Sequence, residues 1–286
     1  MSAEILKGAP VAAALNEKSK EICAGLKLKG VNPCLAIVRV GERGDDIAYE
    51  RGILKRCSAL DVVARQVILP ETVSQSELIS VIENLNGDTN IHGILVFMPL
   101  PSHIDEAAIR ETISPEKDVD GVTSGSAAYV YSGQGIGFAP CTARAVMEIL
   151  KYYNIPLASR RAAVFGRSMV IGKPVSMLLM AENATVTVCH SRSLNADEIS
   201  KQADIVVAAL GKAKALREAY FREGQCVIDV GINFDENGKM CGDVDFSAAE
   251  KTVSQITPVP GGVGAVTTAV LLRHTLEAAE KMMTKK

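Results

Sequence analysis

The 286-residue sequence lacks the features that mark several large classes of protein. It has no run of basic residues, and a formal net charge of −2 argues against a dedicated nucleic-acid surface. No apolar stretch approaches the length of a transmembrane helix, and residues 1–22 lack the apolar core of a signal peptide. We therefore expect a cytoplasmic enzyme or binding protein, with neither a membrane nor a nucleic acid as partner.

A disulfide framework and a metal-ligand pattern are also missing. The seven cysteines are scattered, with no C-x-x-C pair and no histidine at metal-binding spacing. An odd number without a framework fits a reducing compartment, so we expect most of these thiols to be buried as small apolar groups. No metal site is predicted.

What the sequence does contain is an alternation of strand-like apolar runs with segments of helical period. Strands are predicted at 34–40, 64–70, 92–100, 161–166, 185–190, 203–210 and 226–232, with a weaker one at 242–246. Helices are predicted at 46–59, 74–87, 105–113, 143–154, 173–183 and 266–282. This order predicts an α/β protein with parallel sheets, built as two lobes with a cleft between them and separated by residues 114–142.

The second series begins with a candidate phosphate loop, "VFGRSMVIGKP" at 164–174. A strand that runs through a glycine turn into a helix offers free amides and a positive helix end to a pyrophosphate. Gly166 and Gly172 are six residues apart and do not form G-x-G-x-x-G, so an ordinary strand-to-helix loop is an equal alternative.

The following strand favours NADP over NAD. NAD-binding folds commonly end it with an acidic residue for the ribose hydroxyls, but here it ends "CHSRS", with no acid before Asp197. The hydroxyl and the cation of Ser191 and Arg192 suit a 2′-phosphate, and Arg167 can add a charge-assisted contact. His190 is either part of this site or a structural histidine at a strand end.

Two other segments are candidates for ligand contact. "TPVPGGVGAVTTAV" at 257–270 combines stiffening prolines with glycines that allow close backbone approach, which favours a ligand loop over a plain connection. "KDVDG" at 117–121 holds two carboxylates in a turn. They either cap that turn or alternate, one pointing inward and one outward.

The helix at 46–59 presents Tyr49, Ile53 and Arg56 on one face, at i, i+4 and i+7. That face is either a packing surface with a tyrosine at its edge or one wall of a site.

Taken together, the motifs resemble the FolD family of methylenetetrahydrofolate dehydrogenase/methenyltetrahydrofolate cyclohydrolase proteins. "PEKDVDG", "APCT", "VFGRSMVIGKP", "NATVTVCHS", "IDVGIN" and "TPVPGGVG" occur in the family's order and spacing, and the resemblance runs from about residue 5 to about 280. It implies a folate-binding catalytic lobe at 1–142, joined by a C-terminal helix at 265–286, and a Rossmann-type, doubly wound NADP-binding lobe at 143–264. It also implies a homodimer that oxidises 5,10-methylenetetrahydrofolate to 5,10-methenyltetrahydrofolate.

The resemblance also implies roles for individual residues. Tyr49 and Asp120 match the family's catalytic positions, where the tyrosine packs against the folate and the aspartate accepts hydrogen bonds from the pterin ring. The other folate-site positions are Phe97, Pro99, Pro260 and Gly261. The cofactor positions are Gly166, Arg167, Ser168, Ser191, Ile232 and Thr142.

The sequence departs from the family where the cyclohydrolase step is assigned. Ile53 replaces the family's lysine, Phe97 replaces the glutamine that pairs with it, and Asp46 stands at a position usually held by serine. Hydrolysis needs proton transfer, for which an amine is suited and isoleucine is not. Hydride transfer depends mainly on positioning the two rings. The sequence therefore predicts a dehydrogenase whose cyclohydrolase activity is lost or very weak.

Nearby cations are poor substitutes for the missing lysine. Lys55 is rotated by about 200° from Ile53 around the helix, and Arg56 lies about 4.5 Å further along the axis and stays protonated. Two alternatives remain open: a bifunctional enzyme that uses Arg56 or a water network, and a non-catalytic protein that binds folate or nucleotide.

Overall fold

The computed structural model describes residues 2–284, which divide into two compact units. Residues 14–141 and 268–284 belong to the unit named here the three-stranded unit. Residues 2–13 and 142–267 belong to the six-stranded unit. Three helices contain the boundaries between them: α1 (Gly8–Leu28), α6 (Cys141–Tyr152) and α10 (Gly264–Thr284).

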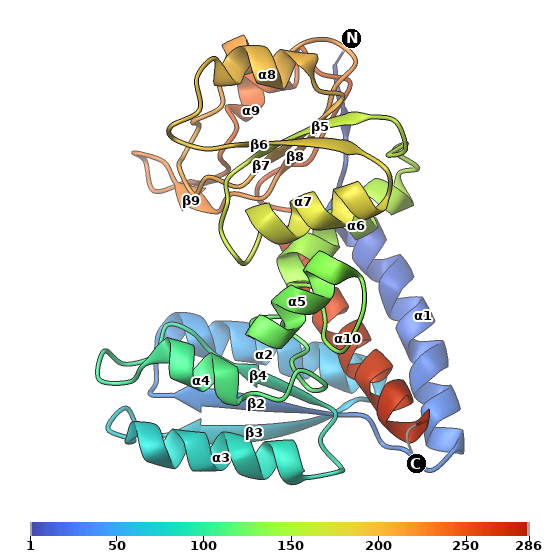
Figure 1. Ribbon diagram of the computed structural model, residues 1–286, viewed down its shortest axis with the longest axis vertical. Helices are drawn as coiled ribbons and strands as arrows, with labels where there is room; N and C mark the ends of the chain where they lie inside the picture. The colour runs from blue at the N-terminus through green and yellow to red at the C-terminus, as the bar shows by residue number, and fades with distance from the viewer. Residues whose placement is uncertain (1, 285–286) are drawn as a thin grey trace. The chain divides into compact units, whose positions relative to one another are not determined.

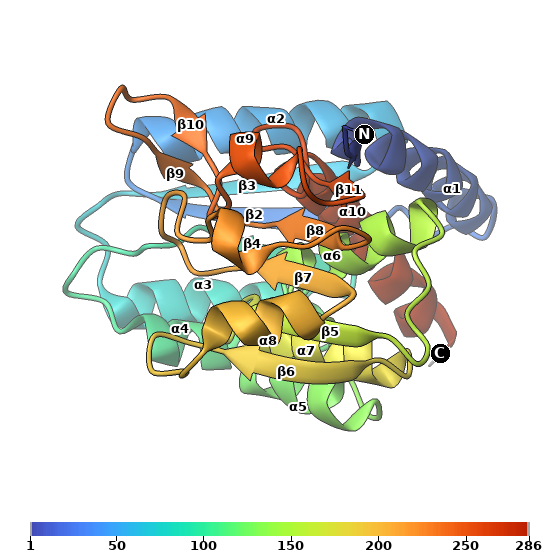
Figure 2. The same cartoon turned by 90° about the horizontal axis from the view of Figure 1, so that it is seen from above.

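The three-stranded unit is a parallel sheet covered on both faces. Its strands are β2 (Cys34–Val40), β3 (Val63–Leu69) and β4 (Gly93–Val96), in the order β3-β2-β4. The chain moves from β2 outward to β3 and then back across to β4. With right-handed crossovers, this order places α2 (Gly44–Leu60) and α3 (Gln75–Gly87) on opposite faces, as Figures 1 and 2 show.

Its core follows from the alternation of side chains along β2. Every second residue of this strand packs in one apolar cluster with the buried face of α3, which contains Leu78, Ile82 and Leu85. Ser74 starts α3 with a capping box, since its side chain accepts from the Glu77 amide and Glu77 reaches back to the Ser74 amide. Two short helices complete the unit: α4 (Glu106–Thr112) and α5 (Ser124–Ser132).

The six-stranded unit is a parallel sheet in the order β1-β11-β8-β7-β5-β6. Its strands are β5 (Arg161–Phe165), β6 (Thr185–Cys189), β7 (Ile205–Ala208), β8 (Cys226–Asp229), β1 (Glu4–Ile5) and β11 (Gln255–Ile256). From β5 the chain goes to β6 on one side and then to β7 on the other. Ligands of such folds bind beyond the carboxyl ends of the strands at this switch.

Helices lie on both faces of this sheet, with α7 (Gly172–Ala181) on one and α8 (Ala196–Gln202) on the other (Figures 1 and 2). The remaining elements are a 3₁₀ turn, η1 (Glu218–Tyr220), strands β9 (Asn233–Phe234) and β10 (Met240–Cys241), and the helix α9 (Phe246–Ala249). The predicted α/β class with parallel sheets and a Rossmann-like part is confirmed.

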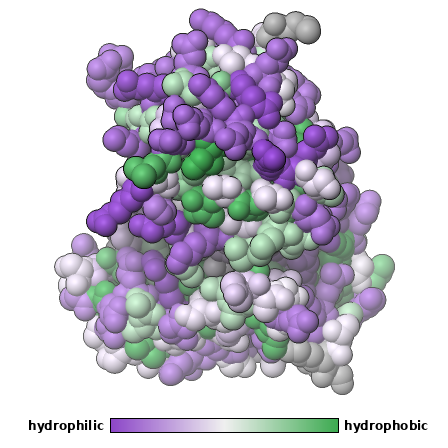
Figure 3. All heavy atoms as spheres, turned by 45° about the horizontal axis from the view of Figure 1, so that its top comes forward, coloured by the Kyte–Doolittle hydropathy of each residue, from purple (hydrophilic) through white to green (hydrophobic). Residues whose placement is uncertain are grey.

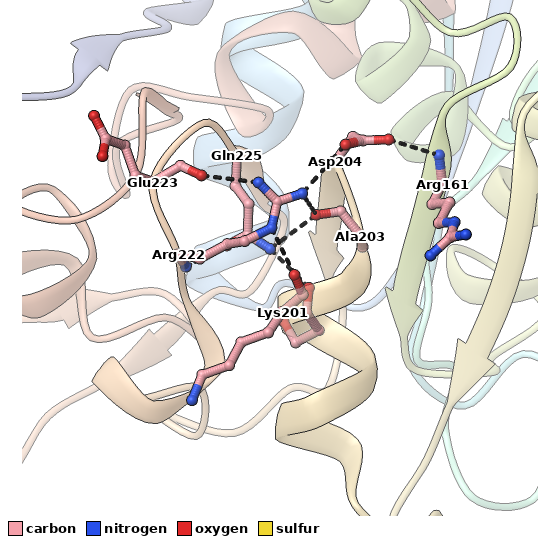
Figure 4. Close-up of polar contacts among 8 residues, drawn as sticks. Arg161, Lys201, Ala203, Asp204, Arg222, Glu223 and Gln225 are labelled. Carbon is pink, nitrogen blue, oxygen red and sulfur yellow. Dashed lines mark hydrogen bonds and ion pairs between the residues drawn. The ribbon is translucent and has the colours of Figure 1, made fainter.

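At the amino ends of these strands, the Arg222 guanidinium closes a hydrogen-bonded network (Figure 4). It donates to the carbonyls of Lys201 and Ala203 at the end of α8, and to the Asp204 carboxylate 3.2 Å away. Asp204 in turn accepts from the Arg161 amide at the start of β5. This network joins the end of α8 to the start of β5, at the amino ends of the strands.

Several predicted elements differ from the structure. The strand predicted at 242–246 is wrong, because its backbone makes only an isolated bridge at Val244, and α9 begins at Phe246. The strand predicted at 92–100 ends at Val96. Helices α1 and α5 were not predicted from the sequence.

The division into units also differs from the predicted boundaries. Residues 2–13, which we expected in the first lobe, lie in the six-stranded unit because β1 pairs with β11. The C-terminal helix was expected to join the first lobe from residue 265, and in the structure α10 belongs to the three-stranded unit from Thr268 onward.

Hydrophilic residues predominate on the face shown in Figure 3, with hydrophobic ones interspersed among them. Within residues 2–284, no helix combines the length and apolarity that crossing a membrane requires. The same residues contain no cluster of three or more metal-ligating side chains. Six of the seven cysteines are buried and the seventh is half-buried, so the prediction that most of them are buried is confirmed.

Candidate functional site

In the three-stranded unit, α2 carries both a packing residue and a site residue on one face. Ile53 is fully buried, whereas Tyr49 is 45% exposed and its ring lies 5.6 Å from that of Phe97, centroid to centroid. Phe97 is buried just after β4. Ile53 therefore packs in the core, and the alternative that this face forms one wall of a site at Tyr49 stays a prediction.

The phenol of Tyr49 connects this face to the 117–121 turn. Burial raises its pKa, and the nearby charge of Asp120 raises it further. The side chain of Thr268 in α10 acts in the opposite direction and lowers the pKa of this phenol. Thr268 was not among the predicted site residues, and its position in the 257–270 loop motif was the signal that could have found it.

The two carboxylates of "KDVDG" have different tasks. Asp118 is fully buried and caps the turn, accepting from the amides of Gly121, Val122 and Thr123 at 2.8–3.0 Å. Asp120 is half-buried, and desolvation together with the charge of Asp118 raises its pKa to about 6. A carboxylate held this way is ionised at neutral pH and suited to accept from a ligand's N–H groups.

Pro99 lies at the exposed end of the segment that follows β4. Its carbonyl accepts a hydrogen bond from Arg43, 3.2 Å away, and Arg43 also lies 3.8 Å from the Asp46 carboxylate. The structure therefore ties the first turn of α2 to the Pro99 loop through a surface arginine.

In the six-stranded unit, the turn after β5 is compact because of two glycines. Gly166 has a φ of 126°, and a Cβ there would lie 2.1 Å from the Ala209 carbonyl oxygen. A Cβ on Gly172 would lie 2.2 Å from the Gly166 oxygen, so the start of α7 packs directly on the turn. Arg167 and Ser168 between them are exposed, and the Ser168 hydroxyl accepts from the Ile171 amide.

The loop after β6 exposes Ser191 and Arg192 beside this turn, since β6 is the neighbour of β5 in the sheet. The His190 ring accepts from the Arg192 amide at 3.2 Å and lies 3.4 Å from the Ser193 hydroxyl. His190 thus shapes the loop, in keeping with a structural strand-end histidine.

A cavity of about 280 Å³ lies beyond β8, lined by Ile232 and by the proline-glycine segment that contains Pro260 and Gly261. The Asp243 carboxylate accepts hydrogen bonds from the amides of Gly211 and Lys212, in the loop that follows β7. Burial raises the pKa of Asp229 to about 6. Neither aspartate was among the predicted site residues. Asp243 lies in the "GDVDF" string, which was predicted as a strand.

The predicted residues thus fall into two groups, each within one unit. Tyr49, Phe97, Pro99 and Asp120 belong to the three-stranded unit. The others belong to the six-stranded unit: Thr142, Gly166, Arg167, Ser168, Ser191, Ile232, Pro260 and Gly261. Thr142 is half-buried in the first turn of α6. The predicted cleft between the lobes stays a prediction.

Comparison with protein families matches two domains to this chain. Residues 6–120 match the catalytic domain of tetrahydrofolate dehydrogenase/cyclohydrolase, and residues 140–283 match the NAD(P)-binding domain of the same proteins.

Individual relatives cover nearly the whole chain. The bifunctional protein FolD of Carboxydothermus hydrogenoformans is 52% identical over 97% of this chain and 98% of its own length. The solved FolD of Campylobacter jejuni is 40% identical, with a TM-score of 0.94 over 98% and 99% of the two chains. The Trypanosoma brucei enzyme, solved with NADP cofactor and an inhibitor, is 36% identical, with a TM-score of 0.90 over 99% of both chains.

Proposed function

The chain belongs to the tetrahydrofolate dehydrogenase/cyclohydrolase family, and from that premise we propose that it is an NADP-dependent methylenetetrahydrofolate dehydrogenase with little or no cyclohydrolase activity. The observation that carries the proposal is the pair of apolar residues, Ile53 and Phe97, buried beside an otherwise equipped site. Tyr49, Asp120 and the glycine turn supply binding groups for both ligands.

The residues of the six-stranded unit fit NADP. The turn at Gly166 and Gly172 brings backbone to where side chains would block it, at the amino end of α7. Arg167 and Ser168 would hold the pyrophosphate side of the cofactor, and Ser191 with Arg192 would hold the 2′-phosphate. When bound, NADP supplies the acceptor for the hydride that leaves the methylene carbon of the folate.

The chain's own contribution to this step is to orient the substrate. Asp120 accepts hydrogen bonds from the donors of the pterin ring, and Tyr49 supplies an aromatic surface for it. No proton is transferred when the hydride leaves, so the step requires no acid or base. Orientation alone can account for much of such a rate enhancement.

Hydrolysis of the methenyl product makes a demand that this site does not meet. Water must be activated and a proton moved, but Ile53 carries no ionisable group and Phe97 no polar one. The guanidinium of Arg56 is close enough to lower the pKa of Tyr49, but a guanidinium is a poor base. We propose that the methenyl product is released to another catalyst or hydrolyses in water.

The test is a side-by-side assay of the purified protein. NADPH formation from methylenetetrahydrofolate is followed by absorbance, and conversion of methenyltetrahydrofolate is compared with the uncatalysed rate. We expect NADPH formation, slower turnover with NAD, and no hydrolysis above background. Rapid hydrolysis would support the bifunctional alternative, and absence of both activities would support a non-catalytic binding protein.

A paired substitution sharpens this test. Ile53→Lys with Phe97→Gln should restore hydrolysis, because the amide gives the buried amine a partner. Ile53→Met with Phe97→Gln, which lacks the amine, is the matched control and should stay inactive in hydrolysis while forming NADPH.

Two further parts of the proposal concern the whole protein. We propose that it acts as a homodimer, which the family resemblance implies, in the reducing cytoplasm that its scattered cysteines fit. Light scattering after size-exclusion chromatography should give twice the 30.4 kDa chain mass.

A further inference from the structure

The backbone carbonyl of Val119, directly before Asp120, receives two side chains from other elements. His274 of α10 places its Nδ1 2.9 Å from this oxygen, and the Sγ of Cys141 in α6 lies 3.2 Å from it. A carbonyl oxygen can only accept, so Nδ1 of His274 carries the proton of this hydrogen bond. All four residues belong to the three-stranded unit.

His274 is an unusual residue for its position. It is 5% exposed on a helix where Leu271, Leu272 and Leu276 are buried apolar neighbours and Thr275 is a buried hydroxyl residue. Burying an imidazole costs free energy unless the ring is hydrogen-bonded. The hydrogen bond to the Val119 carbonyl offsets that cost. Its ring is also held against the Phe138 ring, with centroids 4.9 Å apart, which fixes the direction of the Nδ1–H group.

The segment around Asp120 is anchored on both sides. Before it, Lys117 donates to three carbonyl oxygens at the end of α3, at 2.7–2.9 Å. Next to it, Asp118 holds the amides of residues 121–123. A Cβ on Gly93 would lie 2.9 Å from the Val119 side chain, so β4 also closes on this residue. The peptide group between Val119 and Asp120 then depends on its carbonyl contacts for its orientation.

We propose that His274 is a positioning residue for Asp120, acting through the Val119–Asp120 peptide, with Cys141 as the second support. The Val119 carbonyl and the Asp120 amide nitrogen belong to one rigid plane. A bond that fixes the carbonyl therefore sets the direction from which the Asp120 side chain departs. This inference rests on the proposed function, since it assigns Asp120 to the folate.

The first experiment separates the two substrates. His274→Leu should raise the KM for methylenetetrahydrofolate about tenfold, the effect of one lost hydrogen bond, while the KM for NADP changes less than about twofold. His274→Asn keeps a side-chain N–H donor and should recover most of the loss. Thr275→Val is the matched control: it removes a buried hydroxyl from the next residue of α10, which bonds only the Leu271 carbonyl of its own helix.

The second experiment tests whether His274 acts through Asp120. Binding of tetrahydrofolate is measured by calorimetry for His274→Leu, Asp120→Asn and the double variant. If the effect passes through Asp120, His274→Leu should weaken binding less than about twofold once Asp120 is already replaced. A full tenfold loss in both backgrounds would mean that the histidine acts elsewhere, and the inference would be overturned.

The outcomes distinguish this inference from the function it rests on. A wild-type protein that forms no NADPH contradicts the proposed function, and the calorimetric cycle still tests His274 without turnover. An active wild type with an unchanged folate KM in His274→Leu overturns the inference. If His274→Leu does not fold, Cys141→Ala replaces it in the same cycle, and an unchanged folate affinity there counts against the proposal.

Discussion

At the scale of single residues, neighbours in sequence take different tasks because their surroundings differ. Asp118 and Asp120 are two positions apart, yet one is satisfied by three backbone amides and the other faces Tyr49 and Cys141. On α2, Ile53 is buried and Tyr49, one helical turn away on the same face, is exposed. Hydrogen bonding shows that Asp118 caps its turn, and burial shows that Ile53 packs in the core.

Folate binding should depend on pH through Asp120. Its pKa is raised to about 6, so the carboxylate is ionised at pH 7 and becomes protonated as the pH falls below 6. The KM for methylenetetrahydrofolate should rise about tenfold between pH 7 and pH 5, since only the anion accepts from two donors. Steady-state kinetics across this range measure it, and Asp120→Asn should remove the dependence and show a high KM throughout.

The same group affects stability in the opposite sense. Between the ordinary value of 3.8 and about 6, the folded state binds the Asp120 proton more tightly than the unfolded chain does. Its contribution to the free energy of unfolding therefore decreases as the pH rises through this window. Urea unfolding of the wild type and Asp120→Asn at pH 4 and pH 7 should show the variant relatively more stable at pH 7.

At the scale of elements, the ends of helices and strands hold the site segments in place. The 117–121 turn is fixed by Lys117, whose buried ammonium caps the carbonyl end of α3. The β5–α7 turn is fixed by glycines that let two backbones touch. The Lys117 hydrogen bonds and the glycine contacts therefore each hold a short polar segment against a parallel sheet.

Removing the Lys117 cap should destabilise the protein. Lys117→Met keeps much of the side-chain volume but leaves three carbonyl oxygens without the cation. The expected loss in the free energy of unfolding is about 2 kcal/mol, the usual range for hydrogen bonds to a charged group. Chemical denaturation measures it. Lys55→Met on the exposed side of α2 is the control and should change stability by less than about 0.5 kcal/mol.

The glycine turn should tolerate no side chain at its helix start. In Gly172→Ala the new Cβ would lie 2.2 Å from the Gly166 oxygen, so turn and helix must separate. We expect NADP affinity to fall at least about tenfold, because the amides that face the phosphates move. Gly52→Ala meets no atom within 4 Å on α2 and should leave NADP affinity unchanged. Equal NADP affinity in the two variants would show that this turn does not hold the cofactor.

At the scale of the whole molecule, each unit has its own sheet and core. The six-stranded unit carries the proposed cofactor residues together with Pro260 and Gly261 of the proposed folate site, and the three-stranded unit carries Tyr49 and Asp120. Residues 2–13 and the end of α10 lie in a different unit from the residues that adjoin them in the chain. Each unit is therefore built from two separate stretches of the chain.

Cofactor binding should be visible as thermal stabilisation of the intact chain. At a concentration 100 times its dissociation constant, NADP should stabilise the folded state by about 2.7 kcal/mol. NAD at the same concentration should raise Tm less, because it lacks the phosphate that Ser191 and Arg192 would contact. Arg192→Ala should reduce the NADP shift and leave the NAD shift unchanged. Equal shifts for both cofactors in the wild type would contradict the assignment of this loop to the 2′-phosphate.

The sequence determined those features that depend on local pattern. Alternating apolar runs and helical periods predicted the α/β class and most elements, because periods of 2.0 and 3.6 residues reflect which face is buried. The motif order predicted the family, and Ile53 stood out from it. Short strands such as β1 and β11 left no such pattern, since two residues are too few to show a period.

Only the tertiary structure decided which distant residues support the site. The local sequence does not distinguish Asp118 from Asp120. In the folded chain, three backbone amides donate to the Asp118 carboxylate, and this contact gives the two residues different roles. Thr268 and His274 reach Tyr49 and Val119 because α10 returns to the three-stranded unit, more than a hundred residues along the chain. Such contacts follow from packing between elements, which a local sequence pattern does not encode.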